Sequence, residues 1–279
     1  MRTEPLKRHT KNLLICLLNC AAALVLGMGC TPPEGRDFKQ GQKEARQGQY
    51  ALSLSLFEHS MKRNPTSPWA MKSAHEGARI AFFETKDFKK AAQFYRHIVV
   101  NSTDSQERIE AQQKLAEVYL DNLQDYPQAI VEYSKLVEQN LSDQNVGQDR
   151  LGLARAHYFQ NNLFQADSEL TEILKLKVEP PLRFNALMLK GNILIAQKDF
   201  SKAAALFKEL IKDYPEKAQH ENVPLTLAVC FEEAGELKEA LVVLESLRKT
   251  YQPPEYIELR IKRLKERQKN QPGAKGFRK

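Results

Sequence analysis

"KGNILIAQKDFSKAAALFKELIKDYP", from Lys190 to Pro215, holds two apolar patterns joined by the polar link "AQKDF". In the second pattern Ala203, Phe207 and Leu210 stand at offsets of zero, four and seven, which fall on one face of a helix. In the first pattern Gly191 takes a position where a small residue lets two helices approach closely. The stretch therefore predicts two packed helices, called helix A and helix B below.

The same arrangement recurs along the chain. When segments are aligned on the small residue of helix B, the intervals between them are 38, 38, 37, 37 and 37 residues, which indicates an array of structural repeats. The small positions are Ser53, Ala91, Ala129, Ala166, Ala203 and Ala240. Four residues after them stand Phe57, Tyr95, Tyr133, Leu170, Phe207 and Leu244.

This pattern resembles the tetratricopeptide repeat, most fully through Gly191, Phe200, Ala203, Phe207 and Pro215. The resemblance covers about residues 34–253. It implies an all-α protein, a right-handed α-solenoid of about six helix pairs, because each pair buries its apolar face against its neighbours. The expected limits are 36–253 for the solenoid and 254–270 for a C-terminal capping helix. In repeat two, Arg79 stands where a small residue is expected, so the register of that helix A stays open.

The start of the chain has the layout of an export signal. A basic segment is followed by the apolar "LLICLLNCAAALVL" at residues 13–26 and by "GMGC", which ends at Cys30. This resembles the bacterial lipoprotein signal, which implies a signal peptide at 1–29, a lipid on Cys30 and a short tether over 30–35. An uncleaved inner-membrane anchor and a simple signal peptide remain alternatives, since residues 13–30 just reach the length of a spanning helix. Thr31, where Asp would retain a lipoprotein at the inner membrane, implies the periplasmic face of the outer membrane.

Charge is concentrated at the two ends. Residues 1–29 carry +3 and residues 260–279 carry +8, which leaves −4 of the total of +7 for the body between them. The high isoelectric point therefore says little about the partners of the body. For the basic end, with a flexible tail expected at 271–279, we favour a solvated surface. Weak contact with anionic lipid headgroups is the alternative, and nucleic acid is not expected for an exported chain.

No catalytic or metal-binding motif stands out, so the sequence predicts neither an enzyme, nor a cofactor, nor a metal site. His157 occupies an apolar position of helix A and Cys230 a small one, so packing is the expected role of both. An enzyme with an unrecognised site is the rival from another class.

The resemblance also implies a place for a partner, because arrays of this family bind partner segments on the face made by helices A. Several of the same residues could instead pack between neighbouring repeats, and that alternative stays open. The predicted groove residues are Gln113, Glu117, Leu120, Leu151, Arg155, Tyr158, Met188, Asn192, Ile195, Leu225 and Val229.

The groove is largely apolar, which favours an amphipathic or extended apolar segment of an envelope protein. The chain as a whole looks like outer-membrane lipoproteins that assist barrel insertion or the assembly of secretins or pili. An adaptor for cell-wall hydrolases is the alternative function.

Overall fold

The computed structural model describes residues 31–139 and 142–270, and every element in these ranges is a helix. The predicted signal peptide, Cys30 and the tail at 271–279 lie outside the described residues. The chain divides into two compact units, Met1–Arg108 and Ile109–Lys279, and each is described by itself.

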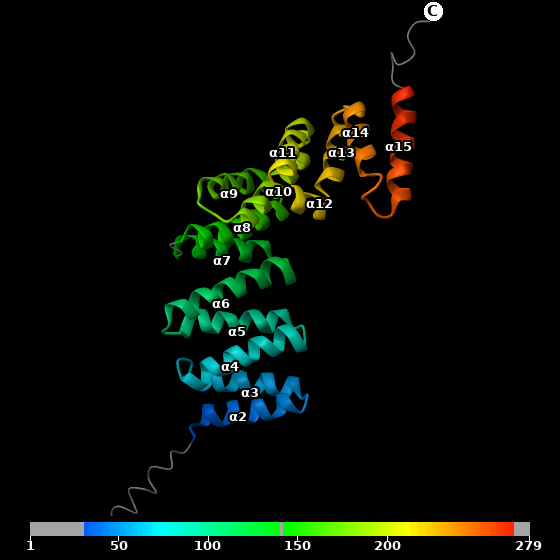
Figure 1. The fold of residues 1–279 in the computed structure, drawn as a ribbon. Coiled ribbons are helices and arrows are strands. Elements are labelled where there is room, and N and C mark those ends of the chain that lie inside the picture. Colours follow the sequence, from blue (N-terminus) through cyan, green and yellow to red (C-terminus); the bar gives the residue numbers. More distant parts are fainter. Residues whose placement is uncertain (1–30, 140–141, 271–279) are drawn as a thin grey trace, which may run out of the picture. The chain divides into compact units, whose positions relative to one another are not determined.

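The described part of the first unit consists of antiparallel helix pairs (Figure 1). Its first helix begins at Pro33, three residues before the predicted start of the solenoid, with Pro at a position where the missing N–H costs nothing. Its helices are α2 (Pro33–Arg46), α3 (Tyr50–Arg63), α4 (Pro68–Arg79) with the π-helical turn η1 (Ile80–Glu84), and α5 (Phe88–Asn101).

The division between the units falls within α6 (Ser105–Glu117), which is followed by the π-helical turn η2 (Val118–Asn122). A short helix, α12 (Pro215–His220), stands between repeats five and six, where the sequence predicts no separate helix. The other helices of the second unit are α7 (Tyr126–Gln139), α8 (Asp143–Phe159), α9 (Leu163–Lys175), α10 (Pro180–Ala196), α11 (Phe200–Asp213), α13 (Val223–Glu233), α14 (Leu237–Leu247) and α15 (Pro254–Lys269).

Every link between helix A and helix B contains one residue with positive φ. Its place advances by 38, 38, 37, 37 and 37 residues, the same intervals that the sequence shows. In repeat five this residue is Lys198, and the next amide, on Asp199, donates to the carbonyl of Leu194, which closes helix A. The six residues are Gly48, Lys86, Gln124, Asn161, Lys198 and Gly235.

The residue after this turn starts helix B in several repeats. The carboxylate of Asp87 accepts a hydrogen bond from the amide of Lys90 at 3.0 Å, and Asp199 accepts one from the amide of Lys202 at 3.4 Å. Such caps satisfy amides that have no partner within the helix. The recurring "KDF" of repeats two and five is therefore a left-handed turn followed by a helix cap.

The two π-helical turns explain why the first two intervals are one residue longer. A π-helical turn adds a residue to a helix without breaking it. η1 and η2 close helix A of repeats two and three, the repeats that lie within the 38-residue intervals. Among the described residues, helices A of repeats four, five and six contain no such turn, and their intervals are 37.

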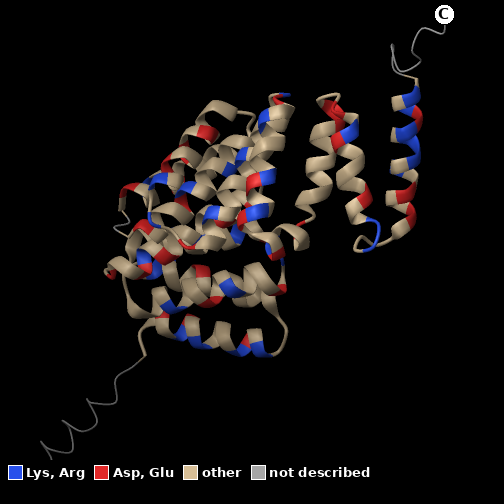
Figure 2. Ribbon diagram, turned by 45° about the horizontal axis from the view of Figure 1, so that its top comes forward, with Lys and Arg blue, Asp and Glu red and all other residues tan. Residues whose placement is uncertain are grey.

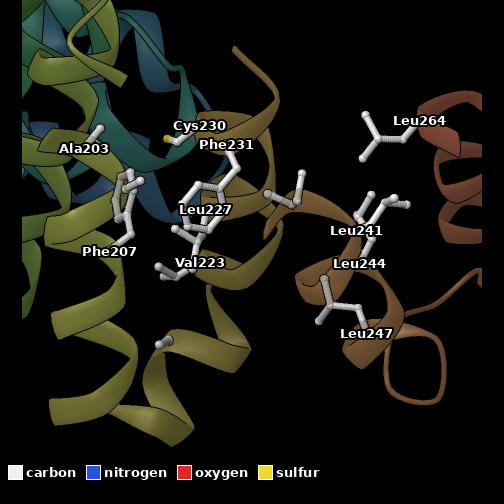
Figure 3. Packing of buried hydrophobic residues seen from close by; sticks show 14 of the residues in the cluster. Ala203, Phe207, Val223, Leu227, Cys230, Phe231, Leu241, Leu244, Leu247 and Leu264 are labelled. Atoms are coloured by element: carbon white, nitrogen blue, oxygen red, sulfur yellow. The ribbon is translucent and has the colours of Figure 1, made fainter. Parts of the chain in front are cut away.

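Aromatic and aliphatic side chains of helix B fill the core between the helices of each pair. A Cβ built on Gly191 would stand 2.4 Å from Cζ of Phe207, so the ring packs directly on the backbone of α10. Figure 3 shows Phe207 beside Phe231 and Leu227 of repeat six, with Leu264 of α15 at the far side of the same cluster. Helix α15, at the place of the predicted cap, thus buries apolar side chains on repeat six.

In repeat two the structure defines the register that the sequence leaves open. Gly77, and not Arg79, takes the small position, because a Cβ on Gly77 would stand 2.4 Å from the ring of Phe94. Phe94 is buried, whereas Tyr95, the residue at the aligned position, is only half-buried. The extra residue of η1 accounts for the larger separation, 17 residues from Gly77 to Phe94 against 16 from Gly191 to Phe207.

Candidate partner-binding surface

Most of the predicted groove residues are half-buried on helices A of the second unit. Leu151 and Tyr158 pack at the edge of one core cluster, and Met188 and Ile195 at the edge of the next. They therefore support the core and also present apolar surface. Gln113, Arg155, Asn192, Leu225 and Val229 are half-buried as well, and Glu117 is exposed.

Leu120 lies in the core and does not contribute to this surface. Only 2% of it is exposed, and it packs in the cluster that contains Leu136 and Leu153. Its assignment to the groove rests on continuous α-helical spacing from Gln113. The π-helical turn that begins at Val118 rotates the residues after it, so Leu120 points inward.

The charged groups of this surface are neutralised in pairs. Nη2 of Arg155 lies 2.6 Å from Oδ1 of Asp121, and Nζ of Lys114 lies 2.7 Å from Oε2 of Glu117. Burial raises the pKa of the nearby Tyr133 phenol, the carboxylates of Glu117 and Asp121 act in the same direction, and Arg155 opposes them. Tyr133 therefore stays protonated, and the surface offers apolar contacts and hydrogen bonds more than net charge.

Exposed aromatic side chains lie at the end of helix A of repeat four. Phe159 is 50% exposed; it stacks on Tyr126 with ring centroids 5.5 Å apart and meets Tyr158 edge-on at 5.7 Å. Phe164, at the start of α9, is 80% exposed. The spacing of apolar residues does not predict that either phenylalanine is exposed, because exposure depends on the neighbouring helices.

Two of the cavities in the described part of the first unit adjoin charged or titratable side chains, and the sequence does not reveal them. One of about 310 Å³ is polar and lies between α2 and α4, where Arg46, Glu76 and Arg79 line it with Tyr50 and Glu84. The other, of about 490 Å³, lies between helices B α3 and α5, with Met61, Pro65 and Val100 among its apolar residues.

His97 lines the larger of these cavities. Its Nε2 donates a hydrogen bond to the carbonyl of Pro65 at 2.9 Å, since a carbonyl can only accept. Burial lowers the pKa of His97, and the bond to Pro65 partly opposes that shift.

Within 31–139 and 142–270, no three His, Cys, Asp or Glu side chains are grouped so that they could hold a metal ion. In the same ranges no helix has both the length and the apolar character of a membrane span. His157 is half-buried, and burial lowers its pKa. Cys230 is fully buried in the core of repeat six.

Two sequence models described as "Tetratricopeptide repeat" match the chain, one over residues 151–218 and one over 194–261. No curated protein sequence matches it. Several solved structures share the fold at low sequence identity. The C-terminal part of a TPR repeat-containing protein from Cytophaga hutchinsonii is 17% identical, with a TM-score of 0.58, over 90% of this chain and 95% of that one.

Two further structures come from proteins with a described role or binding site of their own. PilW, described as a widely conserved type IV pilus biogenesis factor, is 14% identical, with a TM-score of 0.53, over 83% of this chain and 100% of that one. YrrB, a TPR protein with an unusual peptide-binding site, is 15% identical, with a TM-score of 0.51, over 74% of this chain and 97% of that one. At these identities the likeness concerns the fold alone.

Proposed function

Because the chain is a tetratricopeptide repeat protein and thus a protein–protein interaction scaffold, we propose that it binds a segment of an envelope protein on helices A of its second unit. The observation that carries this proposal is the row of half-buried apolar side chains on α8, α10 and α13, beside charges that are already paired. Leu151, Met188 and Leu225 represent the three helices.

An apolar segment is the partner that this chemistry favours. A bound segment would cover apolar surface at Tyr158, Met188 and Ile195 without leaving an unpaired charge buried, which would be costly. An amphipathic helix or an extended strand both fit such a face. The exposed Phe159 lies at the end of the same helix as Tyr158 and extends the surface.

The proposal includes a lipid anchor on Cys30, at the periplasmic face of the outer membrane. Its support is the sequence: a basic start, an apolar run, Gly29 before Cys30, and Thr31 after it. Only Thr31 and Pro32 lie between Cys30 and α2, so the first unit would sit close to the bilayer.

Assistance to the assembly of an envelope complex is the role that fits an anchored scaffold. Barrel insertion and secretin or pilus assembly are the candidates, and an adaptor for cell-wall hydrolases is the alternative. The fold that the chain shares with PilW, a type IV pilus biogenesis factor, makes pilus assembly the first to test.

The test is photocrosslinking in cells. A photoreactive amino acid replaces one residue at a time at Gln113, Tyr158, Met188 or Ile195, and crosslinked proteins are identified by mass spectrometry. Ser168 and Glu209, exposed positions on helices B α9 and α11, are the matched controls. We expect one envelope protein to crosslink from the helix A positions and not from the controls.

Equal crosslinking from both sets would contradict the proposal, and so would crosslinking from the controls alone. The intact mass of the protein from cells tests the anchor separately. Removal of residues 1–29 together with the added mass of the lipid supports it, and an intact N-terminus favours the inner-membrane alternative.

A further inference from the structure

The first helix of the fold presents a row of positive charges to solvent. Arg36, Lys39, Lys43 and Arg46 follow one another at spacings of three, four and three residues, which places them along one side of α2. All four are exposed. None of them forms an ion pair within the described residues, although ion pairs are common elsewhere in the fold. We call these four residues the α2 basic row.

The acidic residues of α2 do not neutralise this row. Glu34 is buried, and its backbone carbonyl accepts a hydrogen bond from Ser60 at 2.9 Å. The carboxylate of Asp37 is held by Arg63 of α3 at 2.6 Å. Glu44 accepts a hydrogen bond from the neutral amide of Gln40 and keeps its charge, which offsets only one of the four cations. The row therefore keeps an excess of positive charge.

An aromatic side chain lies beside the row near the N-terminal end of α2. Nζ of Lys39 lies 5.7 Å from the ring centre of Trp69, and Nζ of Lys72 lies 4.9 Å from it. Lys39 also donates to Oγ1 of Thr31 at 3.1 Å. Trp69 is half-buried, so part of the indole meets solvent among these cations. Trp and Lys together are typical of membrane interfaces.

We propose that the α2 basic row, with Trp69 and Lys72, rests on an anionic phospholipid surface and so orients the first unit on the membrane. Charge complementarity favours this occupant, because Lys and Arg near a bilayer are attracted by anionic headgroups. From Cys30 to Pro33 the chain reaches at most about 10 Å, which is close to the screening length of about 8 Å in physiological salt.

The proposal rests on the lipid anchor proposed for Cys30 and deepens it. The lipid would hold the chain at the membrane, and a basic surface beside it adds attraction to anionic headgroups. The basic row would hold the first unit against the bilayer, whereas a lipid on a free tether would let it turn.

Vesicle binding of residues 31–279 tests the surface without the lipid. This fragment contains every described helix and all of the core clusters, and Trp69 is its only tryptophan. Vesicles of phosphatidylcholine with phosphatidylglycerol are compared with phosphatidylcholine alone at low salt. We expect binding only to the anionic vesicles, lost as salt rises, with a blue shift of Trp69 emission and quenching by brominated acyl chains.

A matched pair of variants separates the α2 basic row from net charge. The first variant is Arg36→Gln/Lys39→Gln/Lys43→Gln/Arg46→Gln. The control is Lys262→Gln/Arg263→Gln/Arg267→Gln/Lys269→Gln on α15, which removes the same charge from four exposed cations that lack ion pairs within the described residues. The blue of α15 in Figure 2 is interspersed with red, since Glu255 and Glu266 lie among its cations.

We expect the α2 variant to lower the partition constant by at least about tenfold and to abolish the change at Trp69. The α15 variant should keep that change. Thermal unfolding checks that both variants fold. Equal losses in the two variants, or no response of Trp69, would overturn the proposal, and so would binding to an acidic protein but not to vesicles.

Failure of the α2 surface can be distinguished from failure of the proposed lipid anchor. A chain that binds anionic vesicles while Cys30 carries no lipid in cells overturns the proposed anchor alone. A lipidated chain whose residues 31–279 ignore anionic vesicles overturns the α2 surface alone.

Discussion

Gly77 and Phe94 are in direct contact, and a Cβ added to Gly77 would stand 2.4 Å from Cε1 of the Phe94 ring. Gly77 lies on the buried side of α4, and Phe94 is the aromatic residue of helix B that packs on it. The contact shows which residue of repeat two takes the small position of the family pattern.

Gly77→Ala should therefore destabilise the first unit by about 1–2 kcal/mol, because overpacking outweighs the better helix propensity of alanine. Urea unfolding followed by Trp69 fluorescence measures it. Arg79→Ala is the control, since Arg79 is exposed and its pairs with Glu76 and Glu84 lie at the surface. It should change stability by less than about 0.5 kcal/mol. No loss of stability in Gly77→Ala would contradict the assignment of Gly77 to the small position.

Lys198 is an L-residue held at φ 62° in the link of repeat five. Glycine adopts this conformation without steric cost, so Lys198→Gly should stabilise the second unit by about 0.5–1 kcal/mol. Ala205→Gly, at an exposed interior position of α11, should instead destabilise it by about 1 kcal/mol. Both are measured by thermal unfolding. If both variants lost the same stability, the positive φ of Lys198 would not be a source of strain.

His97 should make the stability of the first unit depend on pH. Burial lowers its pKa, so the folded state binds a proton less readily than the unfolded state, in which the pKa is about 6.5. As pH falls below about 6.5, the unfolded state takes up more protons and the free energy of unfolding decreases, until pH reaches the lowered pKa of the folded state.

His97→Gln should flatten the free energy of unfolding between about pH 7 and pH 5, because glutamine does not titrate and can still donate to Pro65. Urea midpoints read from Trp69 emission measure the effect. Gln93→Ala, which changes an exposed residue of the same cavity that does not titrate, should leave the slope unchanged. If the slope in His97→Gln equals that of the unchanged protein, His97 is not the source of the pH dependence.

Cys230 is the sole cysteine of residues 31–279, and it lies fully buried. Burial raises the pKa of its thiol to about 11, so thiolate is scarce at neutral pH. Iodoacetamide should label Cys230 only in urea, at the rate of unfolding, as followed by intact mass. Val242→Cys, at an exposed site of α14, is the positive control and should react without urea. Fast labelling of native Cys230 would show that repeat six opens readily.

Much of the fold follows from local spacing. The intervals of the small residues in helix B match those of the left-handed turns, because each repeat is one helix pair that packs only on its neighbours. The spacing of apolar residues also predicts α15, the last helix of the described fold, because they line one face of it. The candidate groove is less well defined by spacing, as Leu120 shows, since one inserted residue changes which side chains face the core.

The sequence by itself determined the number of repeats, their helical character and the positions of their links. These depend on periodicity and on turn residues close together in the chain. Only the tertiary structure decided where the extra residues of repeats two and three lie, which of Phe94 and Tyr95 is buried, and which cations of α2 stay unpaired. These depend on how neighbouring helices fill space and on which charges they bring together, and neither is written in the spacing of a single helix.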